Sequence, residues 1–166
     1  MNVLILGYSK CGKSLAGDLI ARWPGGLVSI SVSTSDILFE QYASHANISI
    51  TELMSNKDKY RHQLWEFGRK LQADNPLCLV EQAFDMAFCG DDAVNVVTGV
   101  RNRDEMVAIR AAKMFDLVIW INRNGCDPNS TDCLKPSDAD IVIDNNGTIE
   151  ELRKALQLAI SSRISR

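Results

Sequence analysis

The chain has 166 residues, of which 46% are hydrophobic and 23% are charged. This composition is that of an ordinary globular protein, which excludes a collagen, a coiled coil and a disordered chain, and the length predicts a single domain over 1–166. The net charge of −3 excludes a general basic surface of the kind that binds nucleic acid non-specifically, but leaves room for a local basic cleft.

The cysteines and the hydropathy pattern predict the compartment. The chain has five cysteines, which is an odd number, and no two of them form a C-x-x-C pair. It has only two histidines. This argues against a disulfide framework or a structural zinc site and favours a reducing compartment. No apolar run approaches the about 18 residues of a membrane helix, and the opening apolar stretch is too short for a signal peptide. We therefore expect a soluble, cytoplasmic protein with no membrane partner.

Short β-branched runs alternate with helical patterns along the chain, which is typical of an α/β domain with a parallel sheet. The runs are almost continuously apolar, as in strands that are covered on both faces. The expected strands are 3–6, 27–32, 94–98, 117–121 and 140–143, and the expected helices are 13–23, a broken helical stretch over 36–88, 103–114 and 149–161. Together they predict a P-loop NTPase three-layer sandwich: a five-stranded parallel sheet with helices on both faces.

A phosphate-binding pattern follows the first expected strand. The octapeptide Gly7-Tyr8-Ser9-Lys10-Cys11-Gly12-Lys13-Ser14 fits G-x-x-x-x-G-K-[ST] at every fixed position, and it lies between a strand and a helix as this P-loop requires. Its glycines permit backbone angles at which successive N–H groups point at phosphate oxygens, and the helix N-terminus adds its positive end. We expect Lys13 to reach the β- and γ-phosphates and Ser14 to ligate Mg²⁺.

The pattern predicts ATP and Mg²⁺ as cofactors. The expected nucleotide contacts are Gly7, Ser9, Lys10, Cys11, Gly12, Lys13, Ser14 and Leu15. Cys11 is expected to fill space, not to act as a nucleophile, although a helix N-terminus would lower its pKa. The structural alternative to the whole motif is a glycine-rich turn with a solvated lysine.

A P-loop alone does not separate a GTPase switch, an ATPase motor and a small-molecule kinase. A GTPase reads guanine with N-K-x-D, and the nearest string, Asn56-Lys57-Asp58-Lys59, lacks the final aspartate and lies in a helical stretch. A motor would normally be larger or carry an oligomerisation arm. The pattern favours a kinase, and a non-catalytic nucleotide-binding module is the alternative from another class.

Arginines follow two of the expected strands. Arg101 and Arg103 come after the third strand, and Arg123 comes after the fourth, where it opens the loop 123–137. Ligands of open α/β sheets bind at the carboxyl ends of strands, and a loop of this length and polarity predicts a lid. Each arginine alone could equally be a solvated surface charge. Their shared sheet edge favours cations around a moving phosphoryl group.

The helical insertion over about 36–90 is the natural place for an acceptor. Within it, Arg61, Trp65, Gly68 and Arg69 lie at i, i+4, i+7 and i+8, so one strip of surface carries two guanidinium groups and an indole. Trp65 is either a platform for a stacked base or a core residue. Asp36, just beyond the second strand, is either a proton acceptor or a water-mediated Mg²⁺ ligand, or else a helix cap.

Four segments resemble a known family. They are the P-loop, the helix from Tyr60-Arg61 through Gly68-Arg69, the segment Gly99-Val100-Arg101-Asn102-Arg103-Asp104-Glu105, and the closing Asp144-Asn145-Asn146-Gly147-Thr148-Ile149-Glu150-Glu151-Leu152. They resemble the bacteriophage branch of the nucleoside monophosphate kinase superfamily, which includes deoxynucleoside monophosphate kinases and 5-hydroxymethyluracil DNA kinases. The resemblance covers nearly the whole chain, and only the P-loop is a sharp motif.

The resemblance implies roles for individual residues. Arg101 would bind the acceptor phosphate or the transferring group, Arg123 would belong to the lid, and the turn from Asn145 to Thr148 would pack near adenine. Their placement in the helical insertion or after the third strand, and not the resemblance, puts Arg61, Trp65, Arg69 and Arg103 on the expected acceptor side. A phage-encoded chain would work in the host cytoplasm, and nothing in the sequence indicates an oligomeric state.

The chain departs from the free-nucleotide kinases of this branch. Those enzymes usually have Asp-Val-Arg where this chain has Gly99-Val100-Arg101, and their lids are larger and richer in arginine than 123–137. A glycine at a sheet edge lets a bulky acceptor approach the backbone. The pattern therefore favours the 5-hydroxymethyl group of 5-hydroxymethyluracil in DNA, with the base extruded and stacked on Trp65. A free deoxynucleoside monophosphate is the alternative acceptor, and the acidic net charge counts against DNA.

Overall fold

The computed structural model describes residues 1–23, 30–90, 93–128 and 133–164. Its strands are β1 (Asn2–Leu6), β2 (Ser31–Ser33), β3 (Asn95–Thr98), β4 (Leu117–Asn122) and β5 (Ile141–Asp144). All pairings are parallel, and the five-stranded sheet has the order β2-β3-β1-β4-β5. The helices are α1 (Lys13–Ala21), α2 (Thr34–Ala46), α3 (Ile50–Ser55), α4 (Lys57–Leu71), α5 (Cys78–Ala87), α6 (Arg103–Ala112) and α7 (Ile149–Ile164).

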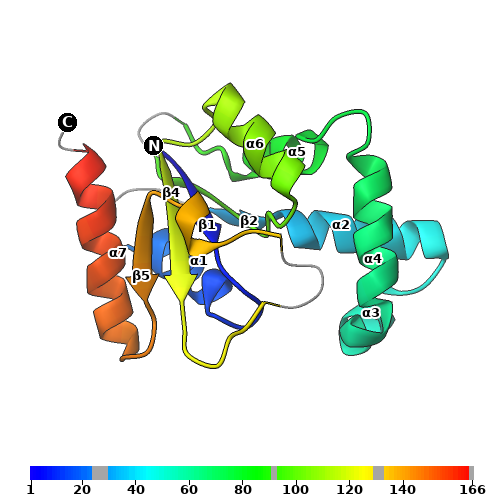
Figure 1. Ribbon diagram of the computed structural model, residues 1–166, viewed down its shortest axis with the longest axis horizontal. Helices are drawn as coiled ribbons and strands as arrows, with labels where there is room; N and C mark the ends of the chain where they lie inside the picture. The colour runs from blue at the N-terminus through cyan, green and yellow to red at the C-terminus, as the bar shows by residue number, and fades with distance from the viewer. Residues whose placement is uncertain (24–29, 91–92, 129–132, 165–166) are drawn as a thin grey trace.

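Helices cover both faces of the sheet (Figure 1). Alternate residues of β1 point to opposite sides, so Val3 and Ile5 pack with α1 and α7, while Leu4 and Leu6 pack with α5 and α6. All four of these side chains are fully buried, and each contributes about 1.5–3 kcal/mol of hydrophobic stabilisation. The expected three-layer sandwich is confirmed.

The second expected strand is the least accurate part of the prediction. Residues 27–29 of that expectation lie outside the described residues, and β2 ends at Ser33 instead of 32. Ser33 pairs with Thr98 of β3, and its side-chain oxygen also accepts a hydrogen bond from the backbone N–H of Ser35. One residue thus ends β2 and caps α2, so the helix begins at Thr34 without an intervening loop.

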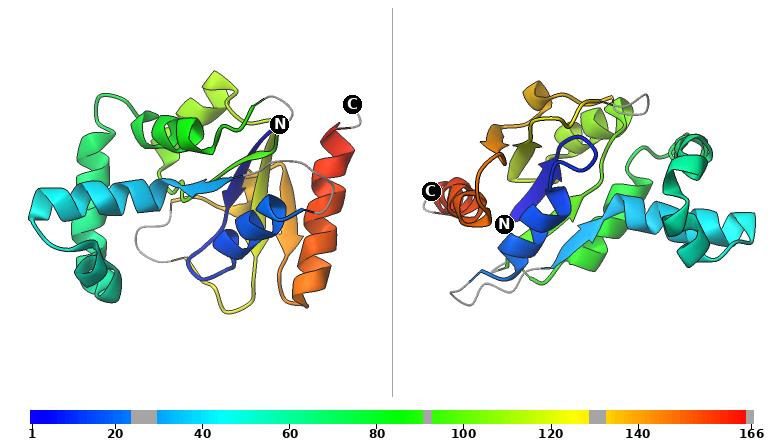
Figure 2. Two further views of the ribbon diagram at one scale, coloured as in Figure 1. Left: turned by 180° about the vertical axis from the view of Figure 1, so that it is seen from behind. Right: turned by 90° about the horizontal axis from the view of Figure 1, so that it is seen from below.

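The broken helical stretch expected over 36–88 is confirmed as several helices. Helices α2, α3 and α4 extend beyond the β2 edge of the sheet (Figure 2), and they share a small core of their own. That core consists of Phe39, Ala43, Leu53 and Leu64. Because α5 packs on the sheet instead, the α2–α4 unit forms one wall of the space beside the β3–α6 turn.

The segment between β4 and β5 contains one short 3-10 turn, Pro136–Asp138, in its described part. Two arginines of α6 hold this part of the chain against the helix. Arg103 forms an ion pair with Asp138, and Arg110 contacts Asp140 at 2.9 Å. Among the helices that the structure describes, none is long and apolar enough to cross a membrane.

Candidate active site

The P-loop takes its shape from residues in left-handed conformations. Gly7, Lys10 and Gly12 have φ angles of 147°, 65° and 102°, as the chain turns from β1 into α1. A Cβ atom on Gly7 would lie 2.7 Å from the carbonyl oxygen of Ile121, and one on Gly12 would lie 2.4 Å from the side-chain nitrogen of Asn145. Both positions therefore require glycine, which leaves a backbone cradle of the kind that holds phosphate groups.

Lys13 lies over this loop. Its Nζ donates hydrogen bonds to the carbonyl oxygens of Gly7 at 2.8 Å and Tyr8 at 2.6 Å. Ser14 is exposed in the first turn of α1. Cys11 is 1% exposed, and burial, the largest effect, raises the pKa of its thiol against the opposing charge of Lys13. The buried, protonated thiol fits the expected space-filling role.

Asn145 lies beneath the loop. It follows β5, is buried, and donates a hydrogen bond from its side-chain amide to the carbonyl oxygen of Cys11. The structure thus connects this residue to the nucleotide loop through the protein backbone. A direct contact between Asn145 and adenine stays a prediction.

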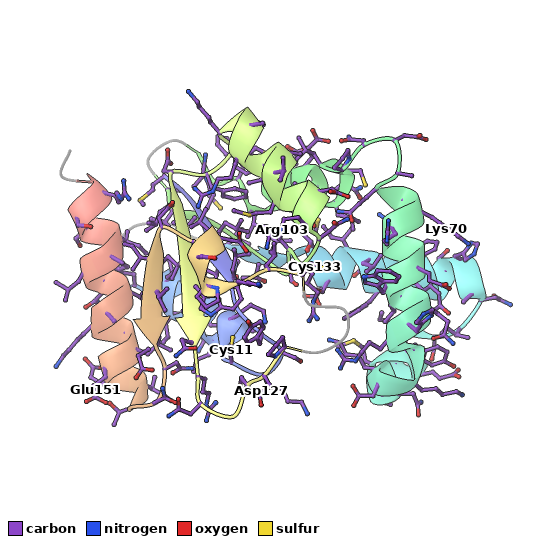
Figure 3. All side chains as sticks on the ribbon, viewed as in Figure 1. Cys11, Lys70, Arg103, Asp127, Cys133 and Glu151 are labelled. Atoms are coloured by element: carbon purple, nitrogen blue, oxygen red, sulfur yellow. The ribbon has the colours of Figure 1, made fainter. Side chains whose placement is uncertain are left out.

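A cavity of about 290 Å³ lies between α2, α4 and the β3–α6 turn. The acceptor-side residues expected from the sequence all line it: Arg61, Trp65, Arg69, Arg101 and Arg103. Figure 3 shows Arg103 and Cys133, two of the lining residues, between the sheet and α4. Among the residues that the structure describes, the lining holds five cations, Lys57 included, and one acidic residue, Asp104. Five basic residues thus lie around one cavity, although the net charge of the whole chain is −3.

The strip on α4 has internal contacts. Arg61 pairs with Asp58 at 2.5 Å, and the guanidinium carbon of Arg69 lies 5.1 Å from the ring centre of Trp65. Trp65 is half-buried, and Arg69 lies in a cation–π arrangement with its ring. The cavity is lined by all four residues of the strip: Arg61, Trp65, Gly68 and Arg69. Their expected alignment on one face of α4 is therefore confirmed.

Lys57 is a cavity residue that the sequence analysis missed. Its Nζ lies 4.3 Å from the ring centre of Phe39, and burial followed by the charge of Arg101 lowers the pKa of its amine. In the sequence, Lys57 stands out only as part of a string similar to the guanine-reading motif. The available signal was its spacing, since Lys57 lies one helical turn before Arg61 on the same face.

Asp36 lies outside this lining. It is exposed in the first turn of α2, and the cap of that helix is Ser33, so the capping alternative for Asp36 is wrong. Partial burial raises the pKa of its carboxyl group, and the charge of Lys57 opposes this shift. A role for Asp36 as proton acceptor stays a prediction.

Arg101 connects the cavity to the P-loop. A narrow notch of about 10 Å³ is lined by Gly7 and Tyr8 of the P-loop and also by Arg101. Arg101 lines the large cavity as well, and so does Cys133. The expected convergence of the P-loop and the arginine after β3 is thus present in the structure.

Arg103 and Arg123, the other two arginines expected at the sheet edge, have different surroundings. Arg103 pairs with Asp138 and donates a hydrogen bond to the carbonyl oxygen of Cys133 at 2.9 Å, so it links the cavity to the segment before β5. Arg123 is exposed directly after β4 and lines neither cavity. The lid function of 123–137 stays a prediction, and residues 129–132 of that loop lie outside the described residues.

Gly99 has a reason for being glycine that the sequence analysis did not foresee. Its φ is +96°, and a Cβ atom would lie 2.7 Å from Thr34 Oγ1 and 2.9 Å from the backbone nitrogen of Ser35. The space beside it is filled by the start of α2. Gly99 also lines the large cavity, so the close approach of a bulky acceptor to its backbone stays a prediction.

Neither a protein-family model nor a curated protein matches the sequence. Solved structures do match in fold. The shikimate kinase from Aquifex aeolicus vf5 has a TM-score of 0.51 at 16% identity over 99% of both chains. The APS kinase of Mycobacterium tuberculosis, in complex with AMPPNP and APS, has a TM-score of 0.58 at 15% identity over 96% of both chains. At these identities the similarity shows the fold, which is the P-loop NTPase fold of these kinases.

Proposed function

We propose that the chain is an ATP- and Mg²⁺-dependent phosphotransferase that acts on a deoxynucleotide. The observation that carries this proposal is the position of Arg101, which lines both the basic cavity and the notch at the P-loop. An arginine at such a junction can neutralise the charge of a phosphoryl group as it moves between donor and acceptor. A nucleotide switch has no need for a second cavity lined by five cations.

The donor side follows from the P-loop. The loop between Gly7 and Gly12 suits phosphate groups, because its glycines have φ angles of 147° and 102° at which backbone N–H groups can point at phosphate oxygens. Lys13 would neutralise the β- and γ-phosphates, and the Ser14 hydroxyl would hold Mg²⁺, which shields the phosphate charge. In the transfer, the acceptor hydroxyl oxygen bonds to the γ-phosphorus, the bond to the β-phosphate oxygen breaks, and ADP leaves. Asp36 is the proposed acceptor of the hydroxyl proton.

The acceptor side supports a nucleotide. A cavity of about 290 Å³ is at the small end of ligand pockets, so it holds one nucleotide unit and not a duplex. Trp65 offers a face for a base, and the surrounding cations match phosphate groups. The first candidate acceptor is the 5-hydroxymethyl group of 5-hydroxymethyluracil in a DNA strand, with the base extruded into the cavity.

A free deoxynucleoside monophosphate is the second candidate, and two observations favour it. In the described part of the lining, five cations outnumber the one acid, which suits a compact phosphate dianion. The packing of Gly99 against the start of α2 also explains why this position is glycine, so the glycine does not by itself favour a bulky acceptor. Both candidates use the same donor chemistry and differ only in what the cavity holds.

Transfer of labelled phosphate from ATP separates these possibilities. The acceptors are 5-hydroxymethyluracil DNA, the same DNA with thymine, and a panel of free deoxynucleotides. We expect label in the modified DNA, and loss of transfer in Lys13→Ala and Arg101→Ala but not in Lys154→Ala, which removes an exposed lysine of α7. Label only in free nucleotides replaces the first candidate by the second. ATP binding without transfer to any acceptor contradicts the phosphotransferase and identifies a binding module.

A further inference from the structure

Arg103 lines the acceptor cavity, but its guanidinium group is already bound to another part of the chain (Figure 3). Its Nη1 atom forms an ion pair with the Asp138 carboxylate, and its Nη2 atom donates a hydrogen bond to the carbonyl oxygen of Cys133 at 2.9 Å. The Asp138 side chain is only 14% exposed, so water screens this pair less than it screens an ordinary surface ion pair. The contacts of Arg103 therefore lie with the segment before β5.

This segment, 133–138, which we call the strap, is held at both ends by the one guanidinium group. The second carboxylate oxygen of Asp138 accepts a hydrogen bond from the backbone N–H of Lys135 at 2.7 Å. The N–H of Asp138 in turn donates a hydrogen bond to the carbonyl oxygen of Lys135 at 2.9 Å. The strap thus ends in a closed turn, and Arg103 ties that turn back to Cys133.

Leu134, inside the strap, forms part of the wall of the notch at the P-loop. Its side chain is 5% exposed and belongs to the same buried cluster as Val100 and Trp120. These three side chains line the notch of about 10 Å³, beside Arg101 and two residues of the P-loop. A volume of this size holds about one water molecule. The place where the P-loop and the cavity meet is therefore narrow and largely apolar.

Water is the competing acceptor when a kinase transfers phosphate from ATP. In that side reaction the water oxygen bonds to the γ-phosphorus, the bond to the β-phosphate oxygen breaks, ADP leaves, and water gives up a proton to the solvent. Closed active sites suppress such side reactions by excluding water. An apolar wall next to Arg101, which lines both the notch and the cavity, would exclude water at the point of transfer.

We propose that Arg103 is a positioning residue that holds the strap against α6 and thereby keeps Leu134 in the wall that excludes water from the junction of cavity and P-loop. The inference rests on the proposed function, because it assigns phosphoryl transfer to that junction. It gives Arg103 a role through the strap in place of the acceptor contact expected from the sequence. Its structural content, the hold of one guanidinium group on the strap, is independent of any activity.

Amide hydrogen exchange tests the structural content. Arg103→Gln removes the ion pair and leaves the strap itself unchanged. We expect exchange at the amides of Lys135 and Ala139 to become about fivefold faster, because the strap opens more often. The matched control is Arg153→Gln, the same substitution at a similarly exposed arginine that pairs with Glu150 on α7, and it should leave these amides unchanged. Unchanged exchange in Arg103→Gln overturns the proposal.

The fraction of ATP that is hydrolysed during transfer separates this role from a direct contact with the acceptor. Asp138→Asn keeps the Arg103 side chain but removes its charged partner. If Arg103 acts through the strap, each variant raises the hydrolysed fraction about fivefold, and the double variant raises it no further.

A direct acceptor contact gives a different pattern. Arg103→Gln then raises the KM for the acceptor, whereas Asp138→Asn, which frees the guanidinium group, does not. This pattern overturns the proposal, and so does an unchanged hydrolysed fraction or an additive effect in the double variant.

Arg103→Lys keeps the assays interpretable should Arg103→Gln not fold. Its single amino group cannot replace both guanidinium nitrogens at once, so we expect changes in the same direction in both assays. A wild-type chain that transfers phosphate to no acceptor contradicts the proposed function, whereas faster exchange in Arg103→Gln would still support the hold of Arg103 on the strap.

Discussion

The side-chain amide of Asn145 donates a 2.8 Å hydrogen bond to the backbone carbonyl of Cys11, across 134 positions of sequence. The bond joins the turn after β5 to the inner side of the P-loop. Gly12, the next residue of the loop, has no room for a Cβ atom because the same amide lies there. The shape of the phosphate cradle therefore depends on a residue from the far end of the chain as well as on the motif itself.

Replacement of Asn145 by alanine is predicted to loosen the cradle. The Cys11 carbonyl loses its partner in a buried environment, which costs about 1–3 kcal/mol of unfolding free energy. We expect ATP binding to weaken about tenfold, since successive N–H groups of the loop lose their alignment. Urea unfolding and calorimetric ATP titration measure the two effects. Asn146→Ala, at the exposed neighbour, is the control, and an unchanged ATP affinity in Asn145→Ala would contradict the bracing role.

The environment of Gly99 predicts the outcome of introducing aspartate at this position, where the free-nucleotide kinases that the sequence resembles usually have it. Gly99→Asp places a Cβ atom within 2.9 Å of the Ser35 backbone nitrogen, at a φ of +96°. We expect a loss of about 2–4 kcal/mol in unfolding free energy and no change of acceptor preference.

Gly90→Ala is the matched control for Gly99→Asp. Gly90 has a φ of +112°, but a Cβ atom there would meet no described atom within 4 Å. It therefore reports the backbone strain alone, expected to cost about 1–2 kcal/mol. A Gly99→Asp protein as stable as Gly90→Ala, or one that now prefers free nucleotides, would show that the glycine serves the acceptor after all.

The ion pair between Arg103 and Asp138 is predicted to hold the segment before β5 against α6. Burial works against ionisation of Asp138, but the hydrogen bonds from Arg103 and from the Lys135 backbone dominate and hold the pKa of the carboxyl group below its usual value. A lowered pKa means that the stabilisation is present above the ordinary pKa of 3.8 and is lost as the pH falls through the lower folded-state value.

Asp138→Asn tests this prediction at neutral pH. We expect faster amide exchange around Asp138 and Ala139, because the charged partner of Arg103 is gone. Arg153→Gln, which breaks the exposed ion pair with Glu150 on α7, should leave that exchange unchanged. Equal protection of residues 138 and 139 in Asp138→Asn would show that the backbone turn, not the ion pair, fixes the segment.

The sequence predicts most of the fold and part of the site, for physical reasons that differ between residues. The strands are buried on both faces and the P-loop has a fixed spacing, so both appear in local patterns. The arginines after β3 are found because the carboxyl ends of parallel strands share an edge. All of these inferences use only the order of neighbouring elements.

Other features depend on contacts between elements that are far apart in the chain. Lys57 belongs to the cavity because α4 packs on α2 beside Phe39, and Gly99 is confined by the start of α2. In the sequence, Glu105 looks like an ordinary glutamate in the first turn of a helix, and only the structure shows that its side chain is buried. The spacing between Lys57 and Arg61 is visible in the sequence, but the contact of Lys57 with Phe39 and the packing around Gly99 and Glu105 are not.

Glu105 also predicts how stability depends on pH. Burial raises the pKa of its carboxyl group from 4.5 to about 7, against the hydrogen bonds from Gln72 and from the backbone of Arg101 and Asn102. The folded chain thus binds this proton more tightly than the unfolded chain does. Its contribution to stability is complete below pH 4.5 and is lost as the pH rises toward about 7.

The shift in the pKa of Glu105 limits the change in unfolding free energy to about 3 kcal/mol between low and high pH. Glu105→Gln has no titrating group, so we expect its unfolding free energy to fall less than that of the wild type between pH 5 and pH 8, by a difference of about 1–3 kcal/mol. Urea unfolding at a series of pH values measures this, with Glu52→Gln as the control for removal of an exposed carboxylate. Parallel curves for wild type and Glu105→Gln would mean that Glu105 titrates at its ordinary value, and that its carboxylate is stabilised in the folded chain as well as it is in water.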